Sequence, residues 1–266
     1  MLAKYDSWIY LQNVTVKEIL SNSDFYADLL ARNKVLGFVE LRPNRRQHEE
    51  ILVSLMRGEG DRSFGPIWDV THPHLENVLP NMPDDFLVGH WHADNTVWEE
   101  SPTITSMHMH TWTGEKGKGN TVLVDCQKLY EKCPSHLRDY LQDLMLLHRS
   151  GANDPETGEL AKGAVHPALR THSVTGGTSL FYTGPVCDPV DGETELFNEY
   201  KTWLNGTQVD GALYDQENQI QWEWSEGDLL IWDNSCMVHG FLGGWKYGER
   251  VFDKLEGQWA KPEYSS

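Results

Sequence analysis

The sequence predicts an α+β fold, mainly β, in which helices surround a central sheet or barrel. Three observations support this prediction. The 266 residues include 11 Trp, 10 Tyr and 8 Phe, and aromatic side chains favour strands. Short segments with strand-like patterns recur through the chain, and helical patterns bracket them. The length also suits one compact unit, because barrel-like β folds often run this long as a single domain. We therefore expect one domain over residues 1–266.

The N-terminal part predicts a helix, a strand and a second helix. Thr15 followed by Glu18 has the spacing of a capping box, which marks the start of the first helix. Phe25, Leu29 and Leu30 fall on one face of this helical segment and predict its buried side. The elements expected next are a strand over 35–41, a helix over 47–57 and a C-cap at Gly58.

The middle of the chain predicts two strands and two helices. Residues 106–112 and 120–124 have strand-like patterns, and residues 134–147 carry apolar side chains at helical spacing. The stretch 150–163 is polar, contains glycine and lacks periodicity, so it predicts a surface loop or lid. The second helix is marked by Leu196, Phe197, Tyr200, Trp203 and Leu204.

The C-terminal third predicts four strands, over residues 220–224, 228–232, 236–242 and 250–255. Gly243 and Gly244 favour a turn between the last two strands. An antiparallel hairpin closed at that turn would set His239 across from Arg250.

The formal net charge is −18, from 22 Lys and Arg against 40 Asp and Glu. A negative surface field repels phosphate backbones and anionic bilayers, so nucleic acid and membranes are not expected as partners. The expected partner is a small-molecule substrate, and the sequence leaves homo-oligomer formation open. An anionic substrate would need a few well-placed Arg or Lys residues in a local cationic pocket.

The cysteines and the N-terminus predict a cytoplasmic protein. The four cysteines lack CxxC spacing, and a chain of this length needs no disulfide staples, so we expect free thiols. The N-terminus lacks the apolar region of a signal peptide, and no stretch of about 18 apolar residues could span a membrane. The cysteines are Cys126, Cys133, Cys187 and Cys236.

A metal site is the strongest chemical signal. In an extended strand, residues two apart share a face, so His92 and Asp94 would point the same way and could bind one ion. His239, on a predicted strand much later in the chain, is the best third ligand. Two imidazoles and one carboxylate form the facial triad of non-haem Fe(II) oxygenases. Zinc hydrolases with similar ligands usually use HExxH on a helix, and the sequence has no such pattern.

Other interpretations stay open at the level of the residues. Twelve histidines give many chance pairs, and an isolated HxD pattern is more often structural than catalytic. His90 shares the strand face of His92, so a cupin-type metal enzyme that does not use α-ketoglutarate is one alternative. A non-catalytic β-barrel binding or sensor protein is another. His108 and His110 could line a barrel, although buried, hydrogen-bonded histidines are the commoner explanation.

Taken together, these motifs resemble the taurine dioxygenase and 2,4-dichlorophenoxyacetate dioxygenase family. The resemblance rests on residues 91–94, on residues 227–234 leading into His239, and on Arg250 eleven positions later. It spans most of the chain, because Arg170-Thr171-His172, Gly176 and Leu180-Phe181 also match the family pattern.

The resemblance implies a double-stranded β-helix, which is the jelly-roll or cupin-like barrel, within residues 81–256, with a helical or lid insert near 134–206. It implies Fe(II), α-ketoglutarate (2-oxoglutarate) and O2 as cofactor and cosubstrates. The iron ligands would be His92, Asp94 and His239. Arg250 and Thr121 would bind the distal carboxylate of α-ketoglutarate.

The resemblance also implies the reaction. An aliphatic C–H bond of a small substrate, anionic or amino-acid-like, would be hydroxylated or cleaved after hydroxylation, while α-ketoglutarate loses CO2 to give succinate. Asp94 favours hydroxylation over halogenation, because related halogenases replace this carboxylate so that chloride can bind. Lys254 lies where taurine-type enzymes carry a substrate-binding arginine, and a lysine lacks the planar fork of that arginine. Trp98, Phe181 and Tyr182 could form walls of the substrate pocket.

Overall fold

The computed structural model describes most of the chain. The described residues are 2–5, 8–56, 68–69, 87–149, 162–182, 184, 187–206, 210–246, 248–258 and 263–264. The side chains of 2–5, 68–69, 87–90 and 263–264 are outside this description. The expected C-cap at Gly58 and most of the expected loop or lid, residues 150–161, lie outside the described residues.

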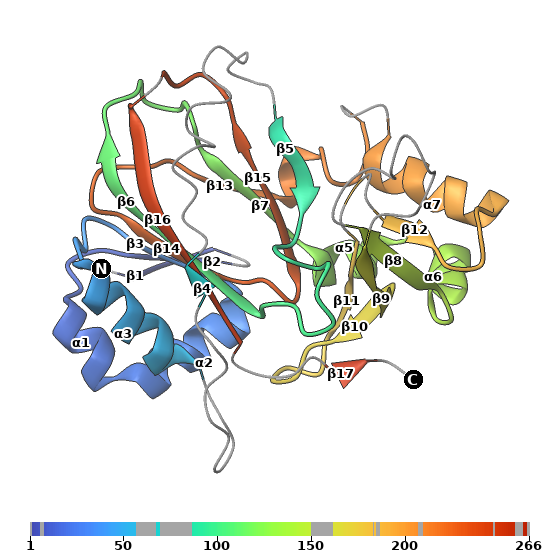
Figure 1. Cartoon of the computed structure of the whole chain (residues 1–266), viewed down its shortest axis with the longest axis horizontal. Coiled ribbons are helices and arrows are strands. Elements are labelled where there is room, and N and C mark those ends of the chain that lie inside the picture. The colour runs from blue at the N-terminus through green and yellow to red at the C-terminus, as the bar shows by residue number, and fades with distance from the viewer. Residues whose placement is uncertain are drawn as a thin grey trace.

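Two β-sheets form the centre of the molecule (Figure 1). The larger sheet has the strand order β1-β2-β3-β14-β6-β16-β4, and the smaller has the order β13-β7-β15-β5. The strands of the larger sheet are β1 Leu2–Tyr5, β2 Trp8–Leu11, β3 Val35–Phe38, β4 Trp68–Asp69, β6 Ile104–Trp112, β14 Leu229–Asp233 and β16 Arg250–Gly257. The strands of the smaller sheet are β5 Leu87–His92, β7 Thr121–Asp125, β13 Gln219–Trp222 and β15 Met237–Leu242.

The two sheets pack face to face through a buried apolar layer. Both sheets contribute to it, for example Met107 and Leu230 from the larger sheet and Leu123 and Met237 from the smaller. Gly37 on β3 belongs to this contact, because a Cβ there would lie 2.0 Å from the Trp222 ring. A side chain at position 37 would therefore force the sheets apart.

Three helices cover the outer face of the larger sheet (Figure 1): α1 Val16–Ser21, α2 Ser23–Asn33 and α3 Arg45–Leu55. Strand β14 shows how the sequence produces this layering. Its side chains alternate, so that Leu229 and Ile231 pack with the helices while Leu230 and Trp232 face the smaller sheet. Every residue of β14 is therefore buried, as expected for a strand that is covered on both faces.

A second layer of helices and two small sheets covers the other side of the four-stranded sheet (Figure 1). Its core joins Val122 and Val238 of that sheet to Leu137 and Phe197 of the helices. The helices are α5 Cys126–Lys132, α6 Ser135–Leu141 and α7 Glu195–Asn205, with a 3-10 helix η2 at Gln216–Asn218. The small sheets have the orders β12-β8-β9 and β11-β10-β17. Their strands are β8 Met145–Arg149, β9 Gly163–Pro167, β10 Leu169–Thr171, β11 Thr178–Leu180, β12 Cys187–Pro189 and β17 Glu263–Tyr264.

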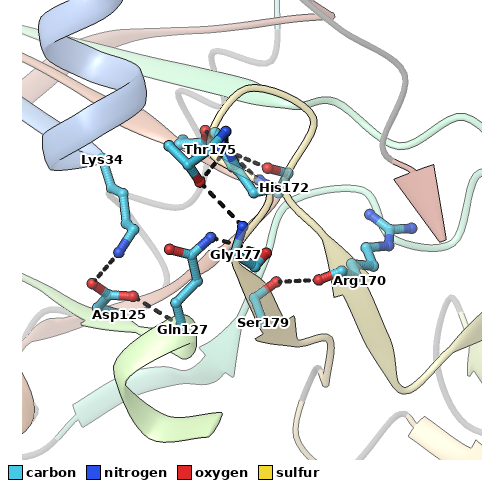
Figure 2. Close-up of polar contacts among 10 residues, drawn as sticks. Lys34, Asp125, Gln127, Arg170, His172, Thr175, Gly177 and Ser179 are labelled. Atoms are coloured by element: carbon cyan, nitrogen blue, oxygen red, sulfur yellow. Dashed lines mark hydrogen bonds and ion pairs between the residues drawn. The ribbon is translucent and has the colours of Figure 1, made fainter. Parts of the chain in front are cut away.

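A polar network connects these layers (Figure 2). Lys34, which ends α2 with a positive φ of 62°, forms a 2.6 Å ion pair with Asp125. The other oxygen of Asp125 accepts from the backbone N–H of Gln127 and so caps α5. The Gln127 side chain donates to the Gly177 carbonyl, which lies just before β11. Asp125 therefore links the first helical layer to the second.

The structure corrects two sequence-based expectations about helices. The helix expected over 134–147 ends at Leu141, and β8 follows, since the same apolar spacing also fits a half-buried strand. Phe25 is exposed, and the buried face of α2 is formed by Tyr26, Ala27, Leu30 and Ala31.

The hairpin expected at residues 243–246 is absent from the described strand pairing. β15 pairs with β5 and β7, whereas β16 pairs with β6 and β4. The two consecutive strands lie in opposite sheets, so the chain crosses between sheets at this point. Arg250 is consequently opposite Trp112, and His239 is opposite His92.

Other expectations are confirmed. The strands expected in the C-terminal third lie within one or two residues of β13 to β16, and the last expected helix is α7. Thr15 caps α1 by accepting from the Glu18 N–H. The four cysteines are free and buried.

Among the described residues, no helix has the length and apolar character needed to cross a bilayer.

Candidate metal centre

Strand pairing brings two distant histidines together. His92 ends β5 and His239 lies on β15, and the antiparallel register of these strands sets the two residues directly opposite each other. Their imidazole centroids are 4.3 Å apart. The Trp232 ring lies 4.9 Å from the His239 ring and forms part of its apolar surroundings.

Asp94 completes the cluster from the turn that follows β5. Its Oδ1 lies 3.7 Å from Nε2 of His92 and 3.7 Å from Nε2 of His239. Asp94 and His239 are each 5% exposed, whereas the His92 side chain is 33% exposed. Solvent and small molecules therefore reach this cluster from the side of His92.

Asn234 holds the backbone of Asp94 in place. The Asn234 side chain accepts a 2.8 Å hydrogen bond from the Asp94 N–H and donates a 3.0 Å bond to its carbonyl. It also donates to the Pro102 carbonyl at 2.8 Å, which fixes its own orientation. The hydroxyl of Thr105 donates to Oδ2 of Asp94 at 3.1 Å, so Oδ1 is the oxygen that faces the histidines. Sequence reasoning included Asn234 in a motif but did not predict this contact.

The surroundings favour an ionised Asp94 carboxylate beside a neutral His239 imidazole. Burial alone would raise the pKa of Asp94, but the neighbouring positive charge of Lys254 acts in the opposite direction, and the pKa lies below its usual value. Burial lowers the pKa of His239 well below its usual value, despite the opposing effect of Asp94. These are the protonation states in which such side chains bind metal ions.

Lys254 contacts the cluster from β16. Its ammonium group forms an ion pair with Oδ1 of Asp94, and it lies 3.5 Å from Oε1 of Glu256. Glu256 is buried, and burial together with the Asp94 charge raises its pKa to about 7. Asn95 donates to the other Glu256 oxygen at 2.5 Å. The structure therefore places Lys254 at the cluster, and the contact with Asp94 is one that the sequence did not predict.

Arg250 and Thr121 lie near Phe241, two positions after His239. Thr121 is opposite Phe241 in the pairing of β7 with β15. The Arg250 guanidinium is buried and lies 5.3 Å from the Phe241 ring centroid, 5.4 Å from that of Trp245 and 4.7 Å from that of Phe252. The Thr121 hydroxyl accepts a 3.0 Å hydrogen bond from the Trp224 indole.

The three aromatic candidates have different surroundings. Trp98 follows Asp94 in the same turn region and is 36% exposed. Phe181 is buried, with the Arg170 guanidinium 3.2 Å from its ring centroid and His148 stacked at 4.8 Å. Tyr182 belongs to the core beside α7, where its hydroxyl accepts from Asn205 at 3.4 Å. Phe181 and Tyr182 are therefore part of the packed interior.

The other histidines considered from the sequence, His90, His108 and His110, are not part of the described cluster of His92, Asp94 and His239. The side chain of His90 is outside the described residues. His108 and His110 do not face the inter-sheet layer; they lie on the face of the larger sheet that α3 covers, where His108 is near His48 of α3. The alternative in which they line the interior is therefore wrong, because strand alternation gives the inward positions to Met107 and Met109. His108 is buried, as the commoner explanation requires, but its ring nitrogens have no hydrogen-bond partner among the described residues.

The geometry fits a divalent transition-metal ion. The ligand atoms of His92, Asp94 and His239 all lie within 4.8 Å of one another. An octahedral ion with bonds of about 2.1 Å needs neighbouring donors about 3 Å apart, so small side-chain rotations suffice. Three protein donors on one side leave the other positions of such an ion open for exogenous ligands.

Comparison with known proteins gives a family match. The family model described as taurine catabolism dioxygenase TauD, TfdA family matches residues 11–251. An alkylsulfatase of Acinetobacter baylyi is 26% identical over 181 residues, which cover 62% of this chain and 55% of that protein. The α-ketoglutarate-dependent 2,4-dichlorophenoxyacetate dioxygenase of Cupriavidus pinatubonensis is 22% identical over 252 residues, covering 77% of this chain and 84% of its own.

The fold also matches solved structures. The crystal structure of AAD-2 in complex with Mn(II) and N-oxalylglycine superposes with a TM-score of 0.72 at 16% identity, covering 98% of each chain. This likeness shows that the strand-rich, mixed architecture is shared. The alignments with the first four curated relatives span between 39% and 55% of the length of those proteins.

Proposed function

Since the chain belongs to the taurine catabolism dioxygenase TauD, TfdA family, we propose that it is an Fe(II)- and α-ketoglutarate-dependent dioxygenase. The observation that carries the proposal is the convergence of His92, Asp94 and His239 into one cluster. Two imidazoles and one carboxylate are the facial triad of this class of oxygenase. The presence of Mn(II) and N-oxalylglycine in the AAD-2 structure agrees with a metal and a dicarboxylate in this fold.

His92, Asp94 and His239 would hold Fe(II), which supplies the activation of O2 needed to oxidise a C–H bond. Asp94 stays ionised beside this ion, and Asn234 keeps its backbone fixed. The carboxylate of Asp94 also fills the position that a halogenase leaves to chloride, so hydroxylation is the proposed outcome, with decarboxylation of α-ketoglutarate to succinate. A chlorinated product from the intact enzyme would contradict this choice.

Arg250 and Thr121 are the proposed partners of α-ketoglutarate. A buried guanidinium surrounded by aromatic rings is poorly screened by water, and its planar fork matches a carboxylate in two hydrogen bonds. We propose that it binds the distal carboxylate of α-ketoglutarate, with the hydroxyl of Thr121 as a second donor. Charge-assisted hydrogen bonds of this kind contribute about 1.5–3 kcal/mol each.

The proposed substrate is small and anionic or amino-acid-like. In a chain of net charge −18, Lys254 places a positive charge beside the metal ligands. One relative is named for 2,4-dichlorophenoxyacetate, which is a carboxylate. We propose that Lys254 attracts the anionic group of the substrate and that Trp98, which lies four residues after Asp94 and is partly exposed, forms part of the pocket wall. Phe181 and Tyr182 remain predictions in that role.

The proposal extends to the fold and the domain. The two facing sheets and their crossing connection agree with a double-stranded β-helix within residues 81–256, with the second helical layer as its insert near 134–206. We propose that residues 1–266 form a single catalytic domain.

An anaerobic titration tests the proposed activity. Fe(II) together with α-ketoglutarate should give the wild-type chain a weak metal-to-ligand charge-transfer band, and admission of air should then release succinate. His239→Ala should lose both signals. His136→Ala is the matched control, because His136 is an exposed histidine paired with Glu199 on the far helices, and it should keep both.

Two further variants separate binding of α-ketoglutarate by Arg250 from binding of the substrate by Lys254. Arg250→Gln should keep the band but require roughly 30-fold or more α-ketoglutarate, since it removes about 2 kcal/mol or more of carboxylate binding. Lys254→Ala should keep the band and raise KM for an anionic substrate found by screening sulfonates, carboxylic acids and amino acids. No band and no succinate from the folded wild-type chain would contradict the proposed function, and an unchanged KM would remove Lys254 from the substrate site.

A further inference from the structure

A second histidine cluster lies on the opposite face of the larger sheet. His108 on β6 and Asp253 on β16 are directly opposite each other in the strand register, so their side chains leave the sheet on the same face. Helix α3 covers this face and contributes His48, whose Nε2 lies 2.8 Å from the Ser106 hydroxyl. Thr105 points to Asp94 on the other side, so the sheet separates this cluster from the proposed iron site.

The donor atoms of this cluster are close together and largely buried. The ligand atoms of His48, His108 and Asp253 all lie within 4.8 Å of one another. His48 is 0% exposed and His108 is 4% exposed. His110 contacts both of the β-strand residues: its ring centroid is 4.4 Å from that of His108, and its Nε2 is 2.7 Å from Oδ2 of Asp253.

The buried imidazole of His108 lacks hydrogen-bond partners within the described part of the chain. Neither of its ring nitrogens has one there, and Nδ1 of His48 also has none. His172 shows the contrast, because its Nε2 contacts Asp233 at 2.6 Å and its Nδ1 accepts from the Thr175 N–H at 3.0 Å. A buried polar group without a hydrogen-bond partner destabilises the folded state, so a ligand that binds these nitrogens would stabilise it.

Burial favours the neutral form of the two buried imidazoles. Burial, with the nearby histidines, lowers the pKa of His108 to about 4 and holds that of His48 well below its usual value. A neutral imidazole offers one nitrogen lone pair to a metal without first losing a proton. Asp253 supplies the negative charge that an unscreened cation needs in a buried site.

We propose that His48, His108 and Asp253 bind a divalent transition-metal ion of the zinc type, separate from the iron site. The contacts of His110 and Arg45 with Asp253 both use Oδ2, at 2.7 and 3.5 Å, so Oδ1 can bind the ion while His110 orients the carboxylate. Two nitrogens and one oxygen suit zinc, with His110 or a water as the fourth donor. The ion joins α3 to β6 and β16, and its burial gives it a structural role.

Zinc stoichiometry tests this site. The full chain without a histidine tag is stripped with chelator, incubated with excess zinc, desalted and analysed for metal. His108→Leu should bind one zinc fewer per chain than the wild type, and so should Asp253→Asn, which keeps the size of the side chain. The control His136→Ala should bind as much zinc as the wild type.

The difference in zinc content between the wild type and His108→Leu does not depend on the proposed iron site. If the proposed iron site fails, the wild type binds one zinc and His108→Leu binds none, and the second site still stands. A thermal measurement provides an independent readout: zinc at about a hundred times its Kd should raise the Tm of the wild type by about 5 °C more than that of His108→Leu. Equal zinc content and equal Tm shifts in the wild type and in both folded variants would overturn the site.

Discussion

Individual side chains of this protein act through their neighbours, and Asn234 is the clearest case. One amide group makes three hydrogen bonds, two to the backbone of Asp94 and one to Pro102, all within 2.8–3.0 Å. The amide therefore sets the position of the carboxylate that two histidines face. His92 and His239 need no comparable device, because strand pairing already places them opposite each other.

Asn234→Ala should weaken metal binding more than any surface asparagine does. Loss of the amide leaves buried backbone groups of Asp94 and Pro102 unsatisfied, which should cost about 2–4 kcal/mol of unfolding free energy. Loss of an orienting partner should also lower Fe(II) affinity roughly 10- to 100-fold. Urea unfolding and an Fe(II) titration measure the two effects. Asn22→Ala, at an exposed helix end, is the control, and equal affinities of both variants would contradict the assigned role.

Asp228 should make folding stability depend on pH. Burial raises its pKa to about 6, against the effect of the backbone N–H groups of Glu40 and Ser225 that it accepts from. Between about pH 3.8 and 6 the Asp228 carboxyl is therefore protonated in the folded protein but ionised in the unfolded chain. The stability that the protonated carboxyl contributes to the folded state is fully present below about pH 3.8. It is lost as pH rises through 6, and the loss is on the order of 3 kcal/mol of unfolding free energy.

Chemical unfolding between pH 4 and 8 measures this contribution. The difference in unfolding free energy between the wild type and Asp228→Asn should change across pH 4 to 6 in the direction that disfavours the wild type at higher pH. A difference that stays constant over this range would show that Asp228 has an ordinary pKa.

At the scale of elements, local sequence patterns predicted the type of secondary structure better than they predicted which strands pair. The alternating residues of β13 to β16 predicted strands at nearly the right bounds. Their pairing was wrong, because β15 and β16 follow each other in sequence but lie in opposite sheets. Sequential strands often pair, and nothing in the residues 243–249 signals that this connection crosses between sheets. The apolar spacing of 144–147 was likewise compatible with helix and strand, and tertiary contacts with β9 and β12 decided for strand.

The ion pair between Lys34 and Asp125 should contribute strongly to the joining of helices and sheets (Figure 2). Asp125→Asn keeps an oxygen to cap α5 but leaves the buried ammonium of Lys34 without its counter-charge. We expect a loss of about 3–5 kcal/mol in unfolding free energy, measured by urea denaturation. Glu193→Gln, which breaks the exposed pair with Lys201, should cost about 1 kcal/mol or less. Similar losses in the two variants would mean that burial does not matter here.

At the scale of the whole molecule, the protein consists of four packed layers, and the cluster of His92, Asp94 and His239 lies within them. The helices α1 to α3, the larger sheet, the smaller sheet and the second helical layer pack in that order (Figure 1). The proposed ligands come from the smaller sheet and its connections, and the cationic groups Arg250 and Lys254 come from β16 of the larger sheet. The proposed metal ligands and these cationic groups therefore meet only where the two sheets pack together.

Much of the candidate site could be predicted from the sequence, because His92 and Asp94 are two residues apart and His239 lies in a family-like motif. The contacts of Asn234 and Lys254 with Asp94 could not, since they join residues of different strands through side chains. The second histidine cluster was hidden for the same reason. His48 is on a helix and Asp253 on a distant strand, and only packing of α3 on the sheet brings them together.

The central claim is that His92, Asp94 and His239 hold one ferrous ion. Anomalous diffraction at the iron absorption edge, from crystals of the chain loaded anaerobically with Fe(II), measures this directly. The account predicts an iron peak bonded to Nε2 of His92, to Asp94 and to Nε2 of His239. An iron peak at other side chains, or a fully loaded protein with no peak between these three residues, would contradict it.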